Sequence, residues 1–288
     1  MQHIVNGFSL GAVYALIAVG FALIYNILKF ANFAHGGVMV ISAYFGYFLS
    51  KNFHTSLFTT LIITTLFGGL CAVIVELIAF HKIRHNNSPL IYYFVSSLVI
   101  TLMIENLIAI FKGATSYAYP VFFKETSFLF GETVISYVNT LIFIISSVIL
   151  IILMWLIKYT KFGIALRAIS FNLGVSKLMG INADGVIIIT FFISGLLAGA
   201  SGMFLGISYT VYPQLARIVV KGWIATVIGG MGSISGAVIG AFALGLFEVF
   251  LISNIGSSLS TVFIFLITLG FLFLRPQGIA GEIFTEKA

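Results

Sequence analysis

Long apolar runs, separated by short polar stretches, cover most of this chain. A helix needs about 20 apolar residues to cross a bilayer, so most of these runs predict membrane-spanning helices. The expected helices are 4–27, 37–50, 57–80, 89–112, 138–157, 186–209, 220–231, 235–254 and 257–275. The run 220–231 is too short to span unaided. The glycine-rich sequence after it predicts a short or re-entrant segment that turns back into the next helix.

Composition points to the same class of protein. Of the 288 residues, 60% are hydrophobic and 8% are charged, and the mean hydropathy is +1.17. This is more apolar surface than one water-soluble core can bury. We therefore expect an all-α polytopic membrane protein with about 8–9 membrane helices, forming a single transmembrane domain over residues 1–288. The lone Cys71 excludes an internal disulfide framework, and the apolar start is expected to remain as a helix.

Basic residues gather after the third, fifth and ninth predicted helices, at Lys82 and Arg84, at 158–177 and at 275–287. The positive-inside rule assigns these regions to the cytoplasm, so the N-terminus is expected outside and the C-terminus inside. The extracytoplasmic loops are then 113–137 and 210–221. Each is available to an extracytoplasmic partner or is simply a solvated connection. Their charged residues are Lys124, Glu125 and Glu132, and Arg217 and Lys221. Membrane topology accounts for the net charge of +6, so no nucleic-acid partner is expected.

Residues 158–184 form the most polar stretch between two apolar runs. They carry Lys158, Lys161, Arg167, Lys177 and Asp184, and glycines divide the stretch into two short amphipathic pieces. Such a segment cannot lie in hydrocarbon. It is expected to be a cytoplasmic coupling segment that a soluble partner grips; the alternative is that its helices lie along the bilayer interface.

Polar residues also interrupt the apolar pattern at 28–37, LKFANFAHGG. Irregular backbone at membrane depth survives only where protein or water satisfies it. Two interpretations remain open: Asn32 and His35 face a translocation route, or the segment is a tight turn with capping side chains. A second interruption, GGMGSISG at 229–236, is followed by small residues at helical spacing, which favours close helix packing over a pore-lining role.

Three carboxylates fall within predicted membrane helices. Glu76 is near the inner end of its helix, where we expect it to pair with Lys82. Glu105 is deeper and stands beside Asn106; a proton-coupled carrier would use such a group, although a second acid or buried lysine is missing from its neighbourhood in sequence. Glu248 is expected to anchor the outer end of its helix or to face a subunit interface.

Other chemistry is nearly absent from the sequence. His81 and His85 have the i, i+4 spacing of a metal pair, but their neighbours are cationic and include no further ligand, so no metal site is expected. The chain lacks a G-x-x-x-x-G-K-[ST] phosphate loop. We expect no cofactor, no catalytic residue and no ATPase activity in the chain itself.

Several short motifs follow one another in order along nearly the whole chain. They are Gly11-Ala12-Val13-Tyr14-Ala15-Leu16, Asn32-Phe33-Ala34-His35-Gly36, Ala43-Tyr44, Ser88-Pro89-Leu90, Glu105-Asn106, Met179-Gly180-Ile181-Asn182, Gly229-Gly230-Met231-Gly232-Ser233 and Leu274-Arg275-Pro276-Gln277-Gly278. Together they resemble the motifs of the LivH-type permeases of branched-chain amino-acid ABC importers. The chain departs from the family pattern at Gly37, at Gly174 and at His81-Lys82-Ile83-Arg84, so ion pairs carried over from the family are in doubt there.

The resemblance implies a multi-pass protein of the bacterial inner membrane that pairs with a second permease of the same type, two cytoplasmic ATP-binding subunits and an extracytoplasmic solute-binding protein. Its cargo would be branched-chain amino acids, and its mechanism alternating access. On this interpretation the ATPase-coupling residues are Gly163, Leu166, Arg167, Ile169, Val175, Leu178, Met179, Gly180, Ile181 and Asn182. The candidate translocation residues are Asn32, His35, Glu105, Asn106, Gly229, Gly230 and Gly232. Two alternatives stay open: a proton-coupled secondary carrier, and an ABC permease for another small solute such as urea or short amides.

Overall fold

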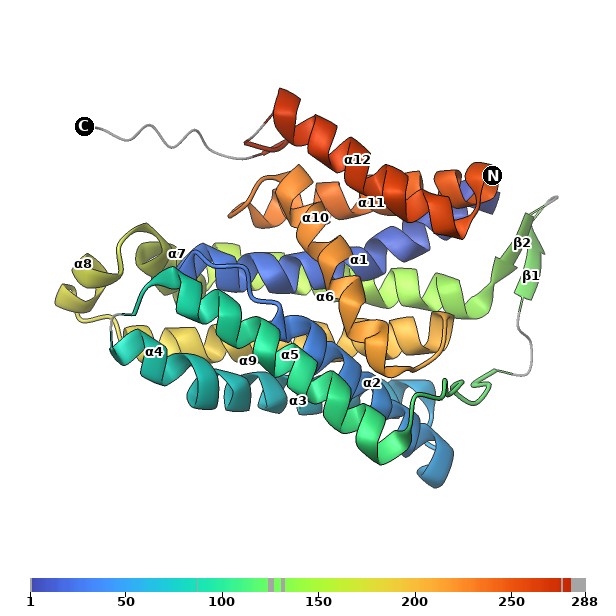
Figure 1. The fold of residues 1–288 in the computed structure, drawn as a ribbon, viewed down its shortest axis with the longest axis horizontal. Coiled ribbons are helices and arrows are strands. Elements are labelled where there is room, and N and C mark those ends of the chain that lie inside the picture. Colours follow the sequence, from blue (N-terminus) through green and yellow to red (C-terminus); the bar gives the residue numbers. More distant parts are fainter. Residues whose placement is uncertain (1, 87, 124–126, 131–132, 276, 281–288) are drawn as a thin grey trace.

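The computed structural model describes residues 2–86, 88–123, 127–130, 133–275 and 277–280, and shows helices lying side by side along one long axis (Figure 1). Lys124, Glu125, Glu132, Pro276 and Lys287 lie outside the described residues. The helices are α1 (Gln2–Leu28), α2 (Ala34–Phe53), α3 (Leu57–Val75), α4 (His81–His85), α5 (Leu90–Lys112), α6 (Tyr137–Tyr159), α7 (Lys161–Phe171), α8 (Leu173–Leu178), α9 (Ala183–Ser208), α10 (Val219–Gly229), α11 (Ile234–Ile255) and α12 (Ser257–Leu274).

The prediction of an all-α polytopic membrane protein is confirmed. Six helices of the described chain are long and apolar enough to cross a membrane, and the shorter apolar α12 accompanies them. Every predicted helix is present. The apolar run 57–80, however, ends in a π-helical turn, η1 (Glu76–Phe80), that leads into α4.

The two expected outer loops have more structure than the sequence suggested. The first, 113–137, contains a short antiparallel hairpin of β1 (Ser127–Phe130) and β2 (Thr133–Ser136). The second, 210–221, is not a solvated loop: it contains a 3-10 helix, η2 (Pro213–Ile218), whose Pro213, Leu215 and Ala216 are buried. In Figure 1 the hairpin and the N-terminus lie at one end of the bundle, and α4, α7 and α8 lie at the other.

Two groups of helices, α1 to α5 and α9 to α12, interlock. The first helix of each group packs against the third helix of the other group, so α1 lies along α11 and α9 lies along α3. Glycines permit both contacts: a Cβ on Gly68 would lie 2.5 Å from Gly195 O, and a Cβ on Gly245 would lie 2.5 Å from Gly11 Cα. In lipid such close backbone approach stabilises helix pairs by van der Waals contact, because apolar surface alone gives no preference for helix over lipid.

Each group also contains an interruption that reaches the middle of the bundle. In the first break, residues 29–33, Phe33 N donates to Ser97 Oγ at 3.2 Å and Thr101 Oγ1 donates to Phe33 O at 2.8 Å. Ser97 and Thr101 stand halfway along α5, so α2 begins at mid-depth. The second break, residues 209–218, ends where Gly36 lies against Ala216 and Val219. The starts of α2 and α10 therefore meet inside the bundle.

Candidate functional site

A buried charged cluster joins α1, α10 and α11 near the second break. Glu248 accepts hydrogen bonds from Tyr14 Oη at 2.9 Å and from Lys221 Nζ, which also donates to Tyr14 Oη at 3.3 Å. The Glu248 side chain is 3% exposed and that of Lys221 is 22% exposed. Burying a carboxylate is tolerable here because it is paired with a cation and hydrogen-bonded.

This cluster corrects two expectations. Glu248 does not face a subunit interface or merely anchor a helix end, since its partners come from α1 and α10 of the same chain. Lys221 does not belong to a solvated outer loop, because the second break carries it inward to meet Glu248. The pairing spans 27 residues of sequence for Lys221 and 234 for Tyr14, so no local pattern announces it.

Asn32 and His35 sit in the protein interior at the first break. They are 2% and 3% exposed. Asn32 Oδ1 accepts from Ala34 N at 3.2 Å, and His35 Nδ1 lies 3.1 Å from Ser194 Oγ on α9. His35 Nε2 has no hydrogen-bond partner among the described residues, and the adjoining cavity measures only about 10 Å³. The structure thus favours the turn with capping side chains over side chains that face an open route.

Glu105 connects α5 to the second break. Its Oε2 lies 3.8 Å from Arg217 Nη2; the Glu105 side chain is 8% exposed and that of Arg217 is 71% exposed. The neighbouring Asn106 is exposed and donates to Leu102 O of its own helix at 2.7 Å. The two adjacent residues therefore point to different surroundings: Glu105 toward η2, and Asn106 away from it.

The glycines Gly229, Gly230 and Gly232 form the turn between α10 and α11. Gly230 and Gly232 have φ of 107° and 95°, which residues with a Cβ rarely adopt. A Cβ on Gly229 would collide with the backbone of Gly236. The chain after α12 also docks on this turn, because Ala280 N donates to Gly229 O at 2.9 Å. The arrangement agrees with the packing interpretation of these glycines.

The coupling segment forms α7 and α8, and its helices are capped by side chains. Gly163 N donates to Thr160 Oγ1 at 3.3 Å, Val175 N to Asn172 Oδ1 at 3.0 Å, and Gly185 N to Asn182 Oδ1 at 3.0 Å. Asn182 thus starts α9, and Gly180, with φ of 82°, makes the turn before it. Ile181 in the same turn is half-buried.

Only part of the predicted coupling surface is exposed. Leu166 and Ile169 are 0% and 2% exposed, and Gly163 is buried against Ile157 O, so the expectation that Leu166 and Ile169 offer direct contacts to a partner is wrong for this structure. They hold α7 to the bundle instead. Arg167 is exposed but donates to Ile157 O at the end of α6. The large exposed apolar side chains of the segment are Phe171 at 95%, Leu178 at 88%, Met179 at 78%, Ile164 at 59% and Val175 at 55%.

An ionic network lies beside the coupling segment. Arg84 Nη1 donates to Glu76 Oε1 at 2.6 Å, and Arg84 Nη2 lies 3.0 Å from Asp184 Oδ1 in the first turn of α9. The expected partner of Glu76 was Lys82; the observed one is Arg84. Between this network and the first break stands Phe80, fully buried, with its ring 5.3 Å from Phe30 and 5.6 Å from Phe191 between centroids.

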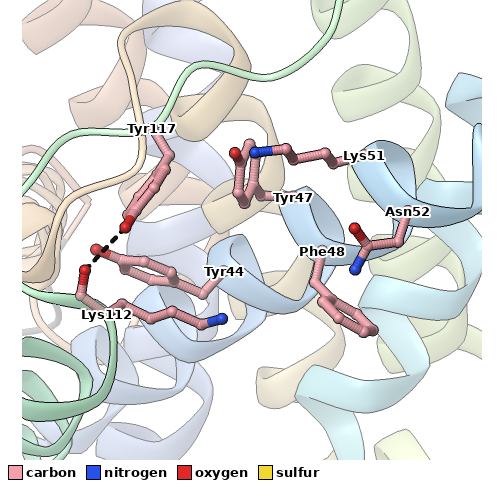
Figure 2. A pocket seen from close by; sticks show the side chains of 7 residues that line it. All are labelled: Tyr44, Tyr47, Phe48, Lys51, Asn52, Lys112 and Tyr117. Carbon is pink, nitrogen blue, oxygen red and sulfur yellow. Dashed lines mark hydrogen bonds between the residues drawn. The ribbon is translucent and has the colours of Figure 1, made fainter.

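At the opposite end of the bundle, a pocket of about 180 Å³ opens between α2, the end of α5 and the chain that follows α5 (Figure 2). We call it the outer pocket; it is lined by Tyr44, Tyr47, Phe48, Lys51, Asn52, Lys112 and Tyr117. Sequence analysis missed it. The i, i+3, i+7 spacing of Tyr44, Tyr47 and Lys51 on one helix face was a usable signal.

Comparison with known proteins gives a consistent family. The family model described as branched-chain amino acid transport system / permease component matches residues 3–272. The chain is 31% identical to the high-affinity branched-chain amino acid transport system permease protein BraD of Pseudomonas aeruginosa and 30% identical to LivH of Escherichia coli, in each case over 100% of this chain and 97% of the relative. It is 29% identical to a probable LivH of Methanocaldococcus jannaschii, over 92% of this chain and 88% of the relative. No solved structure matches significantly. With its multi-pass helical architecture and a family match over nearly its full length, the chain belongs to the branched-chain amino acid transport system permease family.

Proposed function

We propose that this chain forms one half of the membrane pathway of an ATP-driven importer for branched-chain amino acids. The observation that carries the proposal is the exposed apolar surface of α7 and α8, at one end of a chain whose family match extends over residues 3–272. Permeases of ABC transporters work with separate ATP-binding and substrate-binding components. We infer two ATP-binding subunits at the α7 and α8 end, a solute-binding protein at the other end, and a second permease of the same type alongside.

The proposed docking surface consists of Phe171, Val175, Leu178 and Met179, which we call the coupling patch. Burying an apolar side chain of this size contributes about 1.5–3 kcal/mol, less what is lost by ordering both partners. The patch is attached rigidly, because Leu166 and Ile169 pack inside the bundle and Arg167 bonds the end of α6. A force applied at the patch therefore moves α6 and α9 with it.

A route for that movement follows from the contacts. The patch continues through Asn182 into α9, where Asp184 pairs with Arg84, and Arg84 pairs with Glu76 at the π-helical turn. π-Helical turns are frequent at functional sites. Through Phe80 the turn contacts Phe30 in the first break. We infer that closure of the ATP-binding pair tilts these elements and exposes the pathway alternately to the two sides.

For the pathway itself we propose the face where α2, α5 and the second break meet, with Glu105 and Arg217 along it and Asn106, which points away from η2, at its edge. Asn32 and His35 support that face from inside. The turn that connects α10 to α11 is formed by Gly229, Gly230 and Gly232.

Positive residues at the coupling end support an orientation with the N-terminus outside and the C-terminus in the cytoplasm.

Co-expression of the tagged chain with the products of adjacent genes tests the proposal. We expect an ATP-binding subunit to co-purify, and the reconstituted complex to accumulate leucine only with ATP and a solute-binding protein. The double variant Leu178→Ser/Met179→Ser should reduce co-purification about tenfold. The matched control is Leu274→Ser, since Leu274 is also 88% exposed but lies at the end of α12. Purification of the chain alone, with proton-dependent uptake and no ATPase, would overturn the proposal.

A further inference from the structure

The outer pocket has the size of a small-molecule site. A single water needs roughly 10–15 Å³ of such space, so a pocket of about 180 Å³ holds a solute of several heavy atoms. Its position at the ends of α2 and α5 is opposite the coupling patch. It therefore lies where a solute would arrive if the coupling patch faces the ATP-binding subunits.

The pocket wall that comes from the loop is held in place by hydrogen bonds. Tyr117 pairs with Val211 through two backbone bonds of 2.9 and 2.7 Å, and Tyr117 Oη donates to Lys112 O at 2.8 Å. Tyr119 Oη donates to Ala43 O at 2.7 Å, and burial raises the pKa of Tyr119, so this hydroxyl stays a neutral donor. The loop is thus fastened to α2 and to the second break, and its shape is preorganised for a ligand.

Three polar groups in the pocket are available to a ligand: one hydroxyl without a hydrogen-bond partner in the described chain and two ammonium groups without a carboxylate partner there. Tyr44 is 8% exposed, yet its hydroxyl makes no hydrogen bond with any described residue. Neither Lys51 nor Lys112 forms an ion pair with a described carboxylate. Lys51 Nζ lies 5.5 Å above the centre of the Tyr47 ring, and in Figure 2 the Lys112 side chain extends toward Phe48. The hydroxyl of Tyr44 and the two ammonium groups, which solvent reaches, together favour a ligand that carries a negatively charged acceptor.

We propose that the outer pocket binds the carboxylate of a small amphipathic solute, with Lys51, Lys112 and Tyr44 on the carboxylate and the rings of Tyr47 and Phe48 on its apolar part. The inference rests on the proposed function and adds to it a site in the permease itself that receives the amino acid. The carboxylate, and not the ammonium, is the group recognised, because the described lining includes no acidic residue.

A carboxylate can also come from a side chain of the solute-binding protein. The volume favours the small solute, because one Asp or Glu side chain reaching in from a partner would leave most of the space unfilled. The mixed lining points the same way: aromatic surface beside polar groups fits a molecule with an apolar body and one charged end.

The test uses the reconstituted permease complex without solute-binding protein, observed by saturation-transfer NMR, which detects weak binding. The probes are 4-methylpentanoate, which keeps the carboxylate and branched body of leucine, and 3-methylbutylamine, which carries an ammonium on a comparable body. We expect binding of the acid and none of the amine. Lys112→Gln and Lys51→Gln should each weaken binding about tenfold, and Tyr44→Phe, which removes only the hydroxyl, roughly threefold to fivefold.

The control variant is Lys158→Gln. Lys158 also lies over a tyrosine, with Nζ 5.3 Å from the Tyr159 ring centre, but at the coupling end, so its loss should leave probe binding unchanged. Equal binding of acid and amine, or unchanged acid binding in all three pocket variants, overturns the inference. So does weaker docking of the solute-binding protein with unchanged acid binding, because the carboxylate would then be the partner's. ATP-driven leucine uptake by the unmodified complex checks the proposed function separately.

Discussion

The two breaks are held in the bundle by different chemistry. Each brings irregular backbone to mid-depth, where unpaired polar groups are expensive. The first break uses neutral groups: Asn32, Ser97 and Thr101 bond its backbone, and Ser194 bonds His35. The second is anchored by charge just beyond its end, since Lys221 in the first turn of α10 is held by Glu248. Removing one neutral hydrogen bond costs little folding stability. Removing one partner of a buried ion pair costs much more, because the other charge is left buried and unpaired.

This difference predicts the largest effect at the second break. Glu248→Leu leaves Lys221 without its counter-ion and should destabilise the protein by about 3–5 kcal/mol. The double variant Glu248→Leu/Lys221→Met removes both charges and should recover most of that loss. Thermal unfolding of the detergent-purified chain measures both. Equal destabilisation of the single and double variants would show that shape, and not charge pairing, holds α10.

A steric change at the first break should have the next largest effect. A Cβ on Gly20 would lie 2.5 Å from His35 Cε1, so Gly20→Ala must shift the imidazole or the helix against which it packs. Overpacking of this kind costs about 1–3 kcal/mol. The control is Gly270→Ala in α12, where a Cβ would meet nothing within 4 Å. It should be neutral or slightly stabilising, because alanine favours a helix over glycine. Unfolding temperatures that do not separate the two variants would contradict the tight packing around His35.

Removal of one neutral hydrogen bond at the first break should be milder. Thr101→Val keeps the shape of the side chain but loses the 2.8 Å bond to Phe33 O. We expect a destabilisation of about 1 kcal/mol, close to the typical value for one hydrogen bond and well below that of Glu248→Leu. The comparison is made in the same thermal assay. A loss as large as that of the charged variant would erase the distinction between the breaks.

The helices could be predicted from the sequence because hydropathy is a local signal; the expected 186–209, for example, is α9 at Ala183–Ser208. The contacts between helices could not. Glu248, Lys221 and Tyr14 meet only because the second break carries Lys221 inward, which no pattern within one helix describes. The outer pocket needs Lys112 and Tyr117 brought to α2 by the bridge to Val211.

The coupling segment is a case where the sequence held more information than was used. Gly163, Leu166 and Ile169 recur every three residues on α7, a spacing typical of a helix face that packs inward. Phe171 falls outside that row and is 95% exposed. Periodicity alone would have separated the side chains that fix α7 to the bundle from those available to a partner. Which of the exposed side chains a partner contacts depends on a surface outside this chain.

The smallest effect on stability is expected from a substitution beside Arg217, the residue of the second break whose charge lies at the protein surface. Glu105 is buried, but it lies 3.8 Å from an Arg217 side chain that is 71% exposed, and an ion pair in which one partner is hydrated contributes at most about 1 kcal/mol. Glu105→Gln should therefore leave stability nearly unchanged. It should also leave ATP-driven uptake within about twofold, because a permease driven by ATP needs no proton on this carboxylate. Uptake is measured in proteoliposomes with and without a proton gradient. The opposite result is abolished uptake in Glu105→Gln together with dependence of the unmodified protein on the proton gradient. That result would make Glu105 a proton carrier. The functional charge at the second break would then be the pair of Glu105 and Arg217, and not that of Lys221 and Glu248.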